Sequence, residues 1–82
     1  MFSQVVWKKI DDAGLKRAQM INIFQKAGYT PEMDLAVNTF HTNAANDILR
    51  EFPELEGYSI GTIKDLIDQC SREYVFDLSI YN

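Results

Sequence analysis

The chain has 82 residues, of which 46 % are apolar and 24 % charged, and its formal net charge is −4. This length predicts one globular domain, residues 1–82, with a modest hydrophobic core. Such a core leaves little volume for an enclosed substrate cavity, so we do not expect an enzyme.

Cysteine content and hydropathy bear on the location of the chain. Cys70 is the single cysteine, so neither an internal disulfide nor a cysteine-based zinc site is expected. The first residues lack a charged leader followed by a long apolar stretch, and apolar runs span only three or four residues. We therefore expect a cytoplasmic protein without membrane association, metal or cofactor.

Residues 2–13 are compatible with two structures. Their apolar residues share one helical face, and Gly14 is typical of the position just after a helix end. However, Val5 and Val6 followed by Trp7 are also typical of a strand, which would pair with the C-terminal segment. We favour the helix because its apolar stripe is longer.

Two further helices are predicted next. The segment 15–27 places apolar residues on one face and ends at Gly28, a typical C-terminal glycine. The segment 30–51 has the clearest boundaries, because Thr30 can cap a helix that starts with Pro31, and Pro53 ends it near residue 51. Its apolar stripe predicts one buried face.

The last third contains a loop, a helix and a predicted strand. Ser59 can cap a helix whose apolar stripe includes Ile63, Ile67 and Cys70. Residues 75–81 alternate apolar and polar side chains, which indicates a half-buried strand that could add to a second copy and give a homodimer. The predicted fold is mainly α, a compact three- to four-helix domain with a C-terminal extended strand; the alternative is β-α-α-α-β with paired termini.

No catalytic constellation is evident. His41 has no second histidine or cysteine nearby, so we interpret it as packed or solvated. Cys70 lies on an apolar stripe and is interpreted as a core residue. Neither a glycine-rich phosphate loop nor a nucleophile motif occurs.

Charge is distributed unevenly along the sequence, with a net charge of +3 over residues 1–28 and −7 over residues 29–82. A candidate partner-binding site comprises acids near the end of the helix 30–51 and in the following loop, with one aromatic residue: Asp47, Glu51, Glu54, Glu56 and Tyr58. A secondary basic patch comprises Lys8, Lys9, Lys16 and Arg17. The alternatives are an ordinary surface loop and a basic face that only aids solubility.

These observations favour a non-catalytic, acidic interaction protein that binds a basic surface on a partner protein as an inhibitor or regulator. Inhibitors made by phages and mobile elements, antitoxins and small subunits share this size and acidity. The alternative is a DNA-binding regulator that resembles helix-turn-helix proteins and uses its basic N-terminal part. Nucleic acid is the weaker expectation, because the helix after Ser59 carries net negative charge and the turn before it is long.

Overall fold

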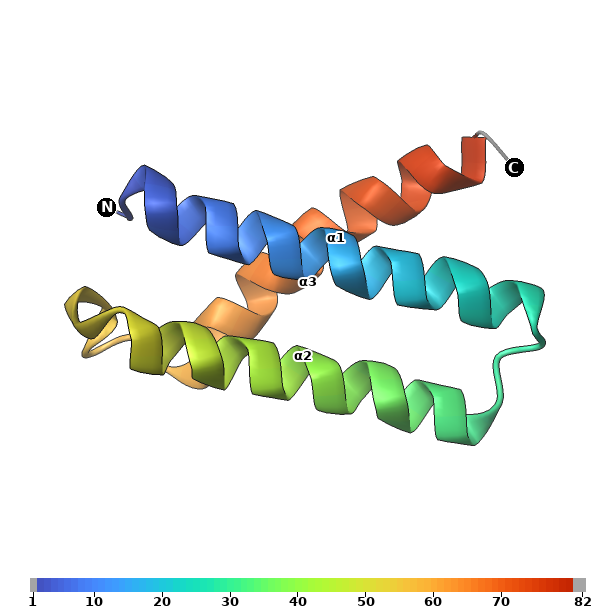
Figure 1. Ribbon diagram of the computed structural model, residues 1–82, viewed down its shortest axis with the longest axis horizontal. Helices are drawn as coiled ribbons and strands as arrows, with labels where there is room; N and C mark the ends of the chain where they lie inside the picture. Colours follow the sequence, from blue (N-terminus) through green and yellow to red (C-terminus); the bar gives the residue numbers. More distant parts are fainter. Residues whose placement is uncertain (1, 81–82) are drawn as a thin grey trace.

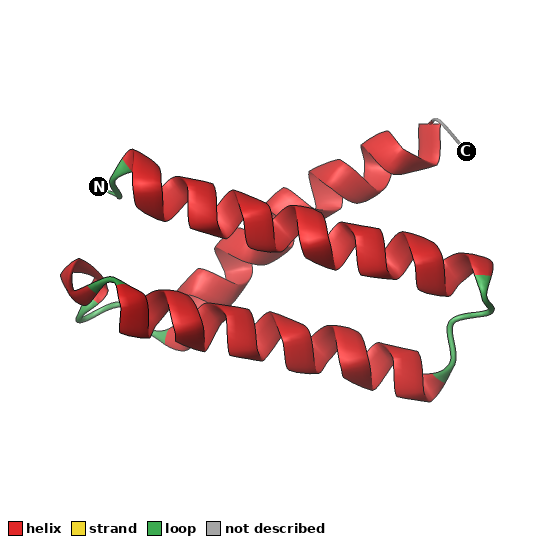
Figure 2. Ribbon diagram, in the orientation of Figure 1, coloured by secondary structure: helices red, strands yellow, loops and turns green. Residues whose placement is uncertain are grey.

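A computed structural model describes the backbone of residues 2–80 and the side chains of residues 2–75. The described chain forms three α-helices and a short 3₁₀ helix, in the order α1 (Gln4–Lys26), α2 (Pro31–Glu51), η1 (Pro53–Leu55) and α3 (Ile60–Ile80). Helices α1 and α2 run antiparallel in one layer, and α3 crosses behind both (Figure 1). Short loops join the helices (Figure 2), so the predicted mainly α class is confirmed.

Helix α1 begins as favoured from the sequence but does not end at Gly14. Ser3 caps it, because its hydroxyl accepts a hydrogen bond from Val6 N–H at 3.3 Å. Gly14 lies inside the helix, where an added Cβ would stand 2.6 Å from Cys70 Cβ on α3. The predicted break is therefore wrong: this glycine permits close contact between two helices instead of ending one.

Helix α2 has the predicted boundaries. The Thr30 hydroxyl accepts a hydrogen bond from the Met33 N–H at 3.3 Å, and Pro31 occupies the first turn. The helix ends at Glu51, as expected from Pro53. Gly28 adopts a φ of 102°, the left-handed conformation that glycine provides after a helix end.

The predicted C-terminal strand is wrong, because α3 continues to Ile80; the rest of that prediction, Tyr81, lies outside the described residues. A helix satisfies its backbone hydrogen bonds internally, whereas a lone strand requires a neighbour. The helical N-terminal segment offers no such neighbour, so the β-α-α-α-β alternative is also wrong. Residues 75–80 therefore provide no strand for pairing with a second copy.

The core lies where α3 crosses α1 and α2. The apolar side chains that are almost fully buried come from all three helices and from η1: Val6, Ile10, Ala13, Ala18, Val37, Ala45, Ile48, Leu55, Ile63 and Ile67. Burial of the predicted α3 stripe is thus confirmed for Ile63 and Ile67. No described helix combines the length and the apolar character needed to cross a membrane.

Candidate functional site

Two of the predicted acidic site residues, Asp47 and Glu51, lie on α2 and already have basic neighbours. Asp47 pairs with Arg50 one turn further along the helix. The Glu51 carboxylate lies 3.7 Å from Lys9 Nζ on α1. These two carboxylates are therefore partly neutralised within the chain.

The residues of the predicted basic patch contact different groups within the chain. Lys8 pairs with Asp12 on the same helix at 3.2 Å, and the Lys16 ammonium lies 5.3 Å from the centre of the Phe40 ring. The Arg17 guanidinium points toward α3, where it lies 3.4 Å from an Asp68 oxygen and donates a 2.9 Å hydrogen bond to the Ser71 hydroxyl.

The structure thus brings members of both predicted patches together. Lys9 and Lys16 share a groove of about 370 Å³ between α1 and α2 with Asp47 and Glu51. Basic and acidic residues that are far apart in the sequence therefore lie near one another between α1 and α2. This groove contains residues of both predicted patches and not acids alone.

The remaining three predicted residues lie together after α2. Glu54 is in η1, and Glu56 and Tyr58 are in the loop before α3; all three are exposed. Within the described part of the chain, no ion pair involves Glu54 or Glu56. In the described structure these two carboxylates thus differ from Asp47 and Glu51, which have basic neighbours.

Local sequence explains how this loop is formed. Pro53 begins η1 one residue after the end of α2, and the single turn of η1 directs Leu55 into the core, where it is 1 % exposed. Gly57 then takes a φ of 99°, which reverses the chain toward Ser59 and α3. The anchored leucine therefore fixes the loop while its glutamates stay in solvent.

Aromatic side chains from the start of α1 meet this loop. The Phe2 ring lies 5.3 Å from the Trp7 ring and 5.0 Å, edge to face, from the Tyr58 ring, measured between centroids. Trp7 and Tyr58 are each 42 % exposed, so the cluster is accessible from solvent. Together these rings form an apolar surface, and Tyr58 follows the unpaired Glu54 and Glu56 closely in the sequence.

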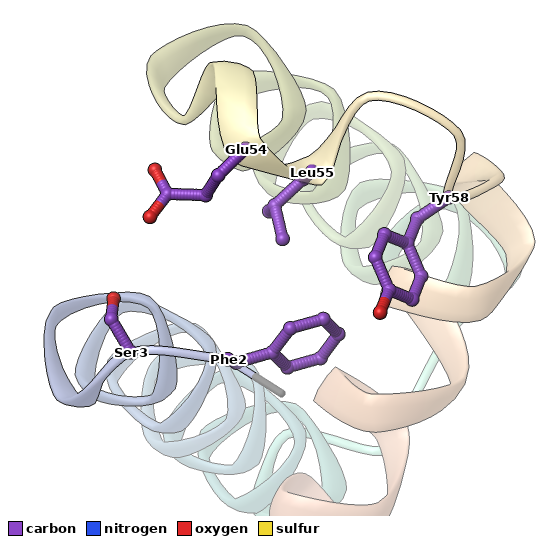
Figure 3. Close-up of a pocket in the computed structure, with 5 residues that line it drawn as sticks. All are labelled: Phe2, Ser3, Glu54, Leu55 and Tyr58. Atoms are coloured by element: carbon purple, nitrogen blue, oxygen red, sulfur yellow. The ribbon is translucent and has the colours of Figure 1, made fainter.

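A pocket of about 340 Å³ opens within this region, and we call it the aromatic pocket; it is lined by Phe2, Ser3, Glu54, Leu55 and Tyr58. Figure 3 shows the Phe2 and Tyr58 rings on one side and the Ser3 hydroxyl and Glu54 carboxylate on the other, with Leu55 between them. The pocket therefore has an aromatic wall (Phe2 and Tyr58), an apolar floor (Leu55) and a polar lip (Ser3 and Glu54).

The sequence interpretation did not place Phe2 in the site, although a signal for it exists. Phe2 immediately precedes the cap Ser3, and Trp7 is the fourth residue after that cap. An apolar pair at these two positions is a hydrophobic staple, which holds the chain entering a helix against its first turn. Recognition of this pattern would have placed Phe2 beside Trp7.

His41 is buried, whereas Cys70, interpreted from the sequence as a core residue, is partly buried and packs against the core. His41 Nε2 lies 2.7 Å from the Lys64 carbonyl oxygen, so this nitrogen donates its proton, and burial lowers the pKa of His41. Burial likewise raises the pKa of the Cys70 thiol, which keeps it protonated. Across the described side chains, no group of three or more His, Cys, Asp or Glu is placed to hold a metal ion.

Comparisons with known protein families, curated proteins and solved structures find no significant match for this chain.

Proposed function

We propose that this chain is a non-catalytic inhibitor or regulator and that its aromatic pocket binds a basic surface on a partner protein. The observation that carries the proposal is the contrast between two sets of acids. Asp47 and Glu51 pair within the chain, whereas Glu54 and Glu56 form no ion pair in the described structure, and Glu54 lines a pocket with the Phe2 and Tyr58 rings.

Each component contributes differently to such an interaction. Exposed aromatic side chains supply contact area with little loss of rotamer entropy, and they often dominate the binding energy at protein interfaces. Unpaired carboxylates attract a basic partner and set its orientation, chiefly through the association rate. Binding would cover basic side chains that the partner needs for its other interactions, and an acidic protein would inhibit the partner in this way.

The DNA-binding alternative receives less support from the structure. Lys9 and Arg17 face carboxylates, and Lys16 lies over an aromatic ring. Nucleic-acid affinity depends on free cations that displace counterions from phosphates. Cations that already have intramolecular partners contribute little to such displacement.

The proposal can be tested by affinity capture from nuclease-treated lysate. The wild-type protein is compared with the E54K/E56K variant at salt concentrations of about 50 and 200 mM. The matched control is E32K/E73K, which changes the net charge equally at exposed positions outside the pocket. Partner proteins should be retained by the wild type and the control but reduced about tenfold for E54K/E56K, most clearly at low salt. Equal recovery of the same proteins by both variants would contradict the proposal.

A further inference from the structure

We infer that the aromatic pocket receives one arginine side chain of the partner, an inference that rests on the proposed function. Ligand sites usually measure about 300–1,000 Å³, and this pocket, at about 340 Å³, has the size for a single long side chain. Its apolar floor and aromatic wall match a hydrocarbon stem, and its polar lip matches a charged tip (Figure 3).

Glu54 determines the sign of the charge that the pocket accepts. Among the described residues that line the pocket it is the only charged one, and it has no ion pair within the described chain. The other residue of the polar lip is Ser3, which caps the amino end of α1, where the helix dipole is positive. The positive end of the dipole repels a cation, so the binding of a cation in this pocket must depend strongly on the Glu54 carboxylate.

Among cations, the aromatic wall favours a guanidinium over an ammonium group. A guanidinium is planar and weakly hydrated, so it stacks on rings such as Phe2 and Tyr58 and can donate two parallel hydrogen bonds to one carboxylate. A lysine ammonium is strongly hydrated and loses more solvation when it enters an apolar pocket. The combination of an aromatic wall and a carboxylate lip therefore selects arginine.

The chain contains its own reporter for this binding. Trp7 is the single tryptophan, and its ring contacts Phe2, which lines the pocket. A side chain that enters the pocket should change the environment of Phe2 and hence the emission of Trp7. Fluorescence titration can therefore be carried out on the unmodified protein.

The experiment titrates the full chain with three capped amino acids: the N-acetyl amides of arginine, lysine and norleucine. Arginine should give a saturable change with at least about threefold higher affinity than lysine, and norleucine should give none. NMR amide shifts should localise the arginine effect to residues 2–7 and 54–58. Equal affinity for norleucine or lysine would overturn the inference.

Two variants separate charge from shape. E54Q keeps the size of the side chain but should reduce arginine affinity at least about tenfold, whereas E32Q, at an exposed position on α2, should retain it. Tyr58→Leu removes the ring and should reduce the preference for arginine over lysine. Far-UV circular dichroism verifies that each variant is folded.

The two proposals fail in different ways. If E54K/E56K loses its captured partners but arginine shows no saturable binding, the inference about arginine is wrong and the proposed function stands. If arginine does not bind and charge reversal leaves capture unchanged, both are wrong. Unchanged arginine affinity in E54Q would also overturn the inference, because the carboxylate would then play no part.

Discussion

Gly14 determines how closely α1 can approach α3. A Cβ at this position would lie 2.6 Å from Cys70 Cβ and 3.0 Å from the Ser71 backbone nitrogen. Alanine normally favours a helix interior over glycine by about 1 kcal/mol. At this crossing we expect the opposite sign, a loss of about 1–3 kcal/mol in the free energy of unfolding, because the two helices must separate.

Chemical denaturation of Gly14→Ala measures this effect, and Gly61→Ala is the matched control. Gly61 also lies in a helix, but the nearest atom to its added Cβ is Ser59 Oγ at an ordinary 3.7 Å. The control should leave the stability unchanged or raise it by less than about 1 kcal/mol. A Gly14→Ala protein as stable as the wild type would show that the crossing is looser than described.

His41 should make stability depend on pH below neutrality. Burial lowers its pKa from the ordinary value of 6.5, and the hydrogen bond to the Lys64 carbonyl opposes this in part; the charges of Arg17 and Lys64 lower the pKa further, and that of Asp68 raises it. As the pH falls through 6.5, the unfolded chain binds a proton that the folded chain resists. The free energy of unfolding therefore decreases from pH 6.5 down to the folded pKa and levels off below it.

The single histidine makes this measurement direct. NMR titration of the His41 ring should give a pKa below that of the unfolded chain. Denaturation between about pH 7.5 and 5.5, above most carboxylate pKa values, should show a stability slope that His41→Gln removes. A folded-state pKa at or above 6.5 would contradict the assignment of a buried, neutral imidazole.

At the level of elements, the two capped helices offer a paired test. Ser3 and Thr30 each accept a hydrogen bond from the third residue of their helix, at 3.3 Å in both cases. Replacement of either residue by alanine should reduce the free energy of unfolding by about 1 kcal/mol. Only Ser3→Ala should also shift Trp7 emission, because Trp7 packs against Phe2 in the staple across that cap. Equal emission from the two variants would argue against the staple.

The C-terminal part of α3 gives a second test at this level. NMR ¹³Cα shifts of residues 75–80 should be displaced in the direction typical of helix, as for residues 70–74 of the same element. Strand-like displacement of residues 75–80 would instead restore the overturned prediction. The measurement therefore distinguishes the two structures without any substitution.

The elements differ in how well local sequence predicts them. For α2, Thr30, Pro31 and Pro53 act through neighbouring residues, so both boundaries were predictable. For α1, the role of Gly14 depends on Cys70, which lies far away in the sequence, and only the three-dimensional packing identifies it. In the tail, a short apolar and polar alternation resembled a strand, but the cooperative extension of an existing helix prevailed.

At the level of the whole molecule, contacts between helices offset part of the charge asymmetry of the sequence. Two cations of α1 pair with acids of the more acidic remainder, Lys9 with Glu51 and Arg17 with Asp68. Counting charges along the chain could not reveal these pairs, because they depend on the antiparallel register of α1 and α2 and on the crossing of α3. The same count did indicate Glu54 and Glu56, which lie in a loop beyond the reach of those cations.

The Lys9–Glu51 and Arg17–Asp68 ion pairs, which each join two helices, should respond differently to salt. Lys9 and Glu51 have side chains about half exposed (49 % and 51 %), whereas those of Arg17 and Asp68 are 16 % and 25 % exposed. A double-mutant cycle with Lys9→Met and Glu51→Gln should give a coupling energy below about 1 kcal/mol that disappears in about 1 M salt. The matching cycle with Arg17→Met and Asp68→Asn should give about 1–3 kcal/mol and retain most of it, because less solvent and fewer ions reach the pair. Equal salt sensitivity of both couplings would show that the α1–α3 crossing is as hydrated as the surface. In that case, the packing of Gly14 against α3, and not the Arg17 ion pair, would hold the two helices in register.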